Sequence, residues 1–83
     1  MEKQMAKVHE LKIDHVYFDD VAEGRKRFEL RKNDREFAVG DVLKLREQDC
    51  GRYTGRTCLK EVLYILKNGE KYGLQPDYII IGL

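Results

Sequence analysis

The sequence predicts an α+β fold that is mostly β, a small curved sheet or barrel of about five to six strands with one main helix. Two observations carry this prediction. Short segments that alternate between apolar and polar residues recur along the chain, whereas a single segment near its start has apolar residues at helical spacing. Closure into a barrel would remove the unpaired edges of a short sheet. We therefore expect the helix to pack against one opening of a strongly curved sheet.

The first strand and the helix are expected near the N-terminus. Val8 to Ile13 alternates, and His9 would point toward the core with its apolar neighbours. Asp14 is a favourable N-cap for a helix that extends to about Glu23, because its carboxylate accepts a hydrogen bond from a free amide of the first turn. Gly24 follows, and glycine often ends a helix.

The second strand is expected at Arg27 to Arg31. Phe28 and Leu30 alternate there with charged residues, so we expect these two apolar side chains to face the core. Glu29 would then share the opposite face with the arginines at either end of the strand.

Three further strands complete the expected fold. Val42 to Arg46 alternates as a third strand, and Leu59 to Leu66 is typical of a long fourth strand that lies centrally. Asn68-Gly69 is a strong turn signal. Tyr78 to Leu83 is nearly all apolar, which predicts a final, almost wholly buried strand.

The two cysteines lie near an expected hairpin turn. Gly51 and Gly55 bracket this turn, and Cys50 and Cys58 are symmetric about Thr54. We therefore expect the two cysteines to be neighbours across the strands. Two cysteines are too few for a disulfide framework or a zinc site, so we expect both thiols to be reduced.

The chain is short enough to form one domain over residues 1–83, with residues 1–7 expected to be a flexible tail. Hydrophobic residues make up 42% of the sequence and charged residues 37%, a composition typical of a globular domain. No apolar run approaches the roughly 20 residues that cross a bilayer, and the N-terminal residues lack the apolar centre of a signal peptide. We therefore expect a cytoplasmic location and no membrane partner.

Positive charge is concentrated between Gly24 and Arg35. This segment holds six basic and two acidic residues, a balance of +4, whereas the rest of the chain holds ten basic and thirteen acidic residues, a balance of −3. Clustered cations bind phosphate groups, so the segment favours RNA or a nucleotide as the partner. A solvated strand whose charges pair with their neighbours is the alternative interpretation. The candidates for an aromatic face that stacks on a base are Tyr17, Tyr53, Tyr64, Tyr72 and Tyr78.

Four residues of this segment, Gly24, Lys26, Glu29 and Arg31, resemble the G-x-K-x-x-E-x-R signature of the ASCH family, a branch of the PUA-like superfamily. The resemblance covers most of the chain from His9 onward. The segments that are similar to a small ASCH-related family of unassigned function, found in bacteria and phages, are His9-Glu10-Leu11-Lys12, Tyr17-Phe18, Arg31 to Arg35, Gly40-Asp41 and Tyr53-Thr54-Gly55. The resemblance implies a PUA-like domain.

The expected binding cleft combines the first strand with the charged segment. Arg31 and Lys32 would bind phosphate, and Lys26 would contact phosphate or base. Glu29 would orient these cations or accept a hydrogen bond from a base amino group. The full set of expected nucleic-acid-binding residues is Lys12, Arg25, Lys26, Glu29, Arg31, Lys32 and Arg35.

Two other functions stay open, although a binding module is favoured over an enzyme. Some ASCH proteins hydrolyse the amide of N4-acetylcytidine and are thought to use the motif lysine with a threonine and a glutamate, so the resemblance implies Lys26 and Glu29 as a catalytic pair. Phe28 and Glu29 stand where the threonine would be sought, and Lys26 meets Glu29 only if it lies on the helix exit or a bulge. A protein-interaction module is the third hypothesis. Because cofactor motifs and metal-ligand clusters are absent from the sequence, we expect no cofactor and no metal.

Overall fold

The computed structural model describes residues 6–83, in which six strands, one α-helix and one short 3₁₀ helix follow one another. The elements are β1 (Val8–Asp14), α1 (His15–Ala22), β2 (Phe28–Lys32), β3 (Val42–Asp49), β4 (Arg52–Glu61), β5 (Tyr64–Leu66), η1 (Gly69–Tyr72) and β6 (Tyr78–Gly82). This arrangement confirms the predicted α+β, mostly β class with one main helix. No helix in the described residues is long and apolar enough to cross a membrane.

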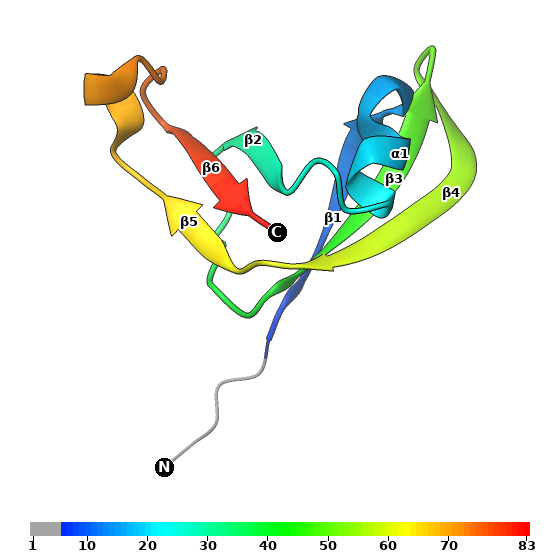
Figure 1. Ribbon diagram of the computed structural model, residues 1–83, viewed down its shortest axis with the longest axis horizontal. Helices are drawn as coiled ribbons and strands as arrows, with labels where there is room; N and C mark the ends of the chain where they lie inside the picture. The colour runs from blue at the N-terminus through cyan, green and yellow to red at the C-terminus, as the bar shows by residue number, and fades with distance from the viewer. Residues whose placement is uncertain (1–5) are drawn as a thin grey trace.

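The strands form two sheets of three strands each. In the first sheet β3 lies between β1 and β4, parallel to β1 and antiparallel to β4. In the second sheet β6 lies between β2 and β5 and is antiparallel to both. Figure 1 shows the first sheet with α1 on one side of the molecule and the second sheet on the other, with β4 leading toward β5.

The sequence predicted either a curved sheet or a barrel. Residues 6–83 do not form a closed barrel, because the chain leaves the first sheet at Val62. The amide of Val62 donates to Asp41 O at 2.8 Å, and the amide of Leu63 donates to Gly82 O of the second sheet at 2.8 Å. The prediction of one long central strand at Leu59 to Leu66 is therefore wrong. This segment contains the end of β4 and all of β5, and each of these strands lies at a sheet edge.

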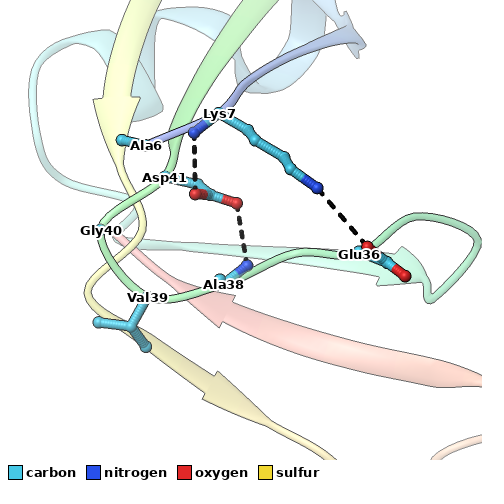
Figure 2. Close-up of a pocket in the computed structure, with 7 residues that line it drawn as sticks. All are labelled: Ala6, Lys7, Glu36, Ala38, Val39, Gly40 and Asp41. Atoms are coloured by element: carbon cyan, nitrogen blue, oxygen red, sulfur yellow. Dashed lines mark hydrogen bonds and ion pairs between the residues drawn. The ribbon is translucent and has the colours of Figure 1, made fainter. Parts of the chain in front are cut away.

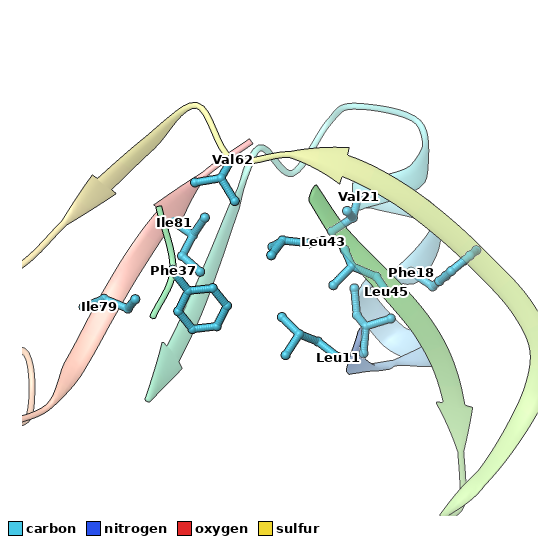
Figure 3. Close-up of a cluster of buried hydrophobic side chains, with 10 residues drawn as sticks. Leu11, Phe18, Val21, Phe37, Leu43, Leu45, Val62, Ile79 and Ile81 are labelled. Atoms are coloured by element: carbon cyan, nitrogen blue, oxygen red, sulfur yellow. The ribbon is translucent and has the colours of Figure 1, made fainter. Parts of the chain in front are cut away.

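One hydrophobic core lies between the two sheets and is also covered by α1 (Figure 3). Burial of apolar area of this kind is the main favourable contribution to folding. Its members come from both sheets, from the helix and from the connections, and they are Leu11, Ile13, Phe18, Val21, Phe37, Leu43, Leu45, Val62, Ile79 and Ile81. The final strand contributes Ile79 and Ile81, while its alternate residues are only half-buried.

The helix begins and ends close to the predicted residues. The Asp14 carboxylate accepts a hydrogen bond from the amide of Val16 at 3.0 Å, which confirms Asp14 as the N-cap. The helix ends at Ala22, and Gly24 then takes a φ of 80°, a conformation that glycine adopts with little strain. Phe18 and Val21 are the buried residues of α1.

The predicted orientation of β2 is wrong. Glu29 is 5% exposed and faces the core, whereas Phe28 and Leu30 are 47% and 54% exposed. The alternation is as expected but its sign is reversed, because the buried carboxylate is compensated by two cations, Lys26 and Arg31. A paired carboxylate can occupy an inward position that an unpaired one could not.

The predicted pairing of the cysteines is also wrong, because the hairpin turns earlier than Thr54. Asp49 pairs with Arg52, and the two residues between them, Cys50 and Gly51, have φ values of 51° and 78°. Two positive φ values are typical of a tight type I′ hairpin turn. Cys58 instead pairs with Leu45, which lies four residues before Asp49 at the end of β3, or about 13 Å at strand rise. Both thiols are free.

The N-terminal end of the described chain is attached to the first sheet. The amide of Lys7 donates to Asp41 Oδ1 at 3.1 Å, and Lys7 O accepts a hydrogen bond from the amide of Val42 at 2.9 Å. Residues 1–5 of the predicted tail lie outside the described residues, whereas Lys7, its last residue, is held by these two bonds. His9 points inward as expected, and its Nε2 lies 2.8 Å from Asp41 Oδ2.

Candidate functional site

A hollow of about 450 Å³ lies where the end of β1, the start of α1 and β2 meet. We call it the basic hollow. Its volume falls within the range of sites that hold small ligands. The residues that line it are Lys12, Ile13, Asp14, Tyr17, Lys26, Phe28, Glu29, Leu30 and Arg31.

Lys26 reaches this hollow because the chain turns back after the helix. The amides of Arg25 and Lys26 both donate to Asp20 O, at 2.8 and 2.9 Å, and Gly24 provides the turn. Lys26 therefore lies on the helix exit, the condition under which it was expected to meet Glu29. Its Nζ donates to Glu29 Oε1 at 3.0 Å and to Phe28 O at 2.8 Å.

Arg31 approaches Glu29 from the other side. Its Nη1 lies 3.5 Å from Glu29 Oε2 and donates to Lys12 O at 2.9 Å, which links β2 to the free edge of β1. The hollow thus contains the three cations Lys12, Lys26 and Arg31 and the two carboxylates Asp14 and Glu29. Its ionised side chains leave a net charge of +1, which suits an anionic ligand.

Two aromatic rings border the Lys26 ammonium. Its Nζ lies 4.5 Å from the centre of the Phe28 ring and 5.4 Å from the centre of the Tyr17 ring. Contacts of this length are cation–π interactions. Among the five tyrosines considered as stacking candidates, Tyr17 is the one that lines the basic hollow.

Four of the predicted site residues line the hollow, namely Lys12, Lys26, Glu29 and Arg31, and three do not. Arg25 is bound to the acidic side chains of α1 and its C-cap, with its Nε 2.9 Å from Asp20 Oδ1. Lys32, the last residue of β2, is exposed on the same face as Phe28 and Leu30 but does not line the hollow. Arg35 donates from its Nη1 to Glu10 O at 2.9 Å.

Two arginines of the charged segment also stabilise the fold by binding the edge of the first sheet. Arg31 and Arg35 donate to two carbonyl groups on the free edge of β1, Lys12 O and Glu10 O. An unpaired strand edge favours wrong association, and covering it with charged side chains is one way in which proteins prevent this. The interpretation of the charged segment as a set of paired residues is thus correct for part of it.

Phe28 and Leu30 were not predicted to line the hollow, because the alternation along this strand predicted that both face the core. One signal could have found them. Glu29 lies three residues after Lys26 and two before Arg31, so both cations can reach an inward carboxylate. A strand that buries Glu29 must expose Phe28 and Leu30.

A second hollow, of about 330 Å³, lies beside the loop that precedes β3 (Figure 2). Its main polar group is the Asp41 carboxylate, which accepts hydrogen bonds from the amides of Lys7 and Ala38 and contacts His9. Burial alone would raise the pKa of Asp41, but the hydrogen bonds from His9 and the two amides outweigh it and lower this pKa. Lys7 Nζ in turn lies 3.5 Å from Glu36 Oε2. These groups bind one another and fix the loop.

The fold and the basic hollow define a class of protein: a small α+β domain in which two three-stranded sheets enclose one core and a cationic, aromatic-walled hollow opens beside β2. The chain belongs to the family described as a domain of unknown function, DUF3850, which matches residues 8–83. It is also similar to the uncharacterized 12.9 kDa protein in the GpA 3′ region of Escherichia phage P2, with 54% identity over 52 residues. The match covers 63% of this chain and 48% of that relative, so the chain spans about half the length of the relative.

Proposed function

We propose that this protein is a nucleic-acid-binding module that holds a phosphate-bearing nucleotide of single-stranded RNA in the basic hollow. One observation carries the proposal: Lys12, Lys26 and Arg31 converge on a hollow that two aromatic rings also border. Cations for phosphate and a ring for a base are the two requirements of single-strand recognition. The resemblance of Gly24, Lys26, Glu29 and Arg31 to the ASCH signature agrees with this assignment.

Each polar residue of the hollow has a role in the proposal. Within residues 6–83 the Lys12 ammonium makes no hydrogen bond or ion pair, so it would bind phosphate most directly. Arg31 carries five N–H donors and would add a second contact to the same phosphate. Glu29 holds Lys26 and Arg31 in position, and its oxygens would accept a hydrogen bond from a base amino group.

The salt dependence of RNA binding tests this function. Lys12→Gln removes one phosphate contact and leaves Lys26, Glu29 and Arg31 in place, because Lys12 contributes only its backbone oxygen to their network. Each lost contact to a single strand makes the slope of log affinity against log salt shallower by about 0.7. We therefore expect a shallower slope of about that size for Lys12→Gln, measured by titration of labelled single-stranded RNA at several salt concentrations.

Lys71→Gln is the matched control, because Lys71 is an exposed lysine of η1 that does not line the basic hollow. Its slope should equal that of the wild type. If Lys12→Gln also kept the wild-type slope while all three proteins bound RNA, the basic hollow would not be the phosphate-binding site.

The 3.0 Å contact between Lys26 and Glu29 supports a second candidate function, hydrolysis of the acyl amide of a modified nucleoside such as N4-acetylcytidine. Water would attack the carbonyl carbon and give its proton to Glu29, which would pass it to the leaving amino group as the C–N bond breaks. The Lys26 ammonium would stabilise the oxyanion that forms in between.

For this activity we expect Lys26→Gln to hydrolyse N4-acetylcytidine at least about 100-fold more slowly than the wild type, the usual contribution of such groups. The release of acetate measures the rate, and a circular dichroism melt establishes that the variant is folded. A folded Lys26→Gln protein with the wild-type rate would exclude this mechanism.

A further inference from the structure

The outward face of the second sheet is apolar, and three of its large side chains, Phe28, Leu30 and Tyr64, are exposed, while residues 73–75 border it beside Leu30 and Tyr78. Antiparallel sheets usually carry polar residues on the face that meets water. Here the outward positions of β2, β6 and β5 are occupied by Phe28, Leu30, Lys32, Tyr78, Ile80, Gly82, Tyr64 and Leu66. A contiguous apolar patch that is left exposed in this way marks a binding surface.

One row across this face, which we call the slot, consists of Phe28, Gly82 and Tyr64. Phe28 and Tyr64 both pair with Gly82, so the two rings stand on either side of a glycine in the central strand. The outer strands are about 10 Å apart, twice the strand spacing, and Gly82 has no side chain to fill the interval. A Cβ atom added at Gly82 would lie 3.2 Å from the Cβ of Tyr64, so any larger residue would crowd the slot.

The charge on this face and the cations of the adjoining basic hollow favour a polyanion. Lys32 is the single charged residue among the outward positions of the three strands, and no acidic side chain occurs there. Phe28 also forms part of the basic hollow, with the Lys26 ammonium 4.5 Å from its ring, so the slot and the hollow are continuous. A second copy of the chain on this face would bring the same cations together, whereas single-stranded nucleic acid combines planar apolar bases with negative charge.

We infer that the row Phe28–Gly82–Tyr64 is a base-stacking slot for single-stranded nucleic acid. This inference rests on the proposed function and extends it. A phosphate in the basic hollow would direct the neighbouring base onto the outer face of β2, where it lies over Gly82 between the two rings. Stacking depends on the ring face, which every base has, so the slot accepts any base.

Tyr64→Leu is the test variant, because Tyr64 is exposed, contributes to the slot and does not line the basic hollow. Two labelled probes separate stacking from phosphate binding: a single-stranded oligoadenylate and an abasic ribose-phosphate chain of equal length. We expect Tyr64→Leu to bind oligoadenylate about 5- to 150-fold more weakly, the range for one lost stacking contact, and to bind the abasic chain like the wild type.

Tyr64→Phe keeps the ring and should bind like the wild type. Tyr72→Leu should do so too, because it changes an exposed tyrosine of η1 that is outside the slot. Wild-type affinity of Tyr64→Leu for oligoadenylate would overturn the slot and leave the basic hollow as the binding site. A wild type that bound neither probe would overturn both proposals. A wild-type dimer that Tyr64→Leu dissociates, with oligoadenylate affinity unchanged, would assign the face to a second copy and overturn the slot.

Discussion

Leu43→Ala is expected to lower the free energy of unfolding by about 2–5 kcal/mol, the range for deleting a buried leucine side chain. Leu43 is 0% exposed and belongs to β3, the central strand of the first sheet. Figure 3 shows its side chain pointing from β3 toward the second sheet. Because a small domain has a total stability of roughly 5–15 kcal/mol, this single change removes a large part of it.

Urea unfolding followed by circular dichroism measures this loss as a shift of the transition midpoint at constant slope. Leu59→Ala is the matched control, because Leu59 is a leucine of β4 that is 64% exposed. Its effect should stay within about 0.5 kcal/mol. A similar loss for both variants would mean that Leu43 does not lie in a packed core between the sheets.

The elements could be predicted from the sequence because their signals are local. Asp14 and Gly24 delimit α1 through their own backbone and side-chain chemistry, β1 shows its alternation directly, and β6 is indicated by its apolar run. The assignment of strands to two sheets could not be predicted. It depends on bonds such as that from Leu63 N to Gly82 O, whose partners are far apart in the sequence.

The candidate site was predicted in part for the same reason. The spacing of Lys26, Glu29 and Arg31 holds whichever way β2 faces, so their grouping could be expected from the sequence. The inward face of β2 is the one with Glu29, because Lys26 and Arg31 pair with its buried carboxylate. Alternation alone shows that one face is buried but not which one. Phe28 was missed for this reason, whereas Tyr64, which pairs with Gly82 opposite Phe28, was among the five tyrosines predicted as stacking candidates.

The hairpin of β3 and β4 shows how a turn signal can mislead. Gly55, taken as one end of the turn, instead lies in an irregularity of β4, where the pairing passes from Arg46 with Thr57 to Gln48 with Tyr53. Glu47 is the only residue of β3 in this interval, opposite three residues of β4. A bulge of this kind redirects side chains, and here Thr54 and Arg56 both reach Glu47.

This cluster makes the stability of the protein depend on pH. Glu47 is buried, its Oε2 accepts a hydrogen bond from Arg56 Nη2 at 2.7 Å, and its Oε1 accepts bonds from Arg56 Nε at 2.9 Å and from the Thr54 hydroxyl at 2.5 Å. The hydrogen bonds from Arg56 and then Thr54 lower the pKa of Glu47 from its ordinary 4.5 to about 2. Because the folded-state pKa lies below the unfolded-state value, the ionised carboxylate stabilises the fold above pH 4.5, and this stabilisation is lost as the pH falls toward 2.

Glu47→Gln removes the ionisable group while keeping an oxygen that Arg56 and Thr54 can bond. We expect the variant to be less stable than the wild type at neutral pH, and the difference to shrink steadily as the pH falls from 4.5 toward 2, because wild-type Glu47 becomes protonated there. Both proteins keep Asp41, whose pKa is also lowered, so some acid sensitivity remains in each. The midpoints of urea unfolding, measured across this pH range, test this prediction. Glu61→Gln is the control, because Glu61 is an exposed residue of β4, and its profile should follow that of the wild type. Parallel pH profiles for the wild type and Glu47→Gln would show that the Glu47–Arg56 contact does not set the acid limit of the fold.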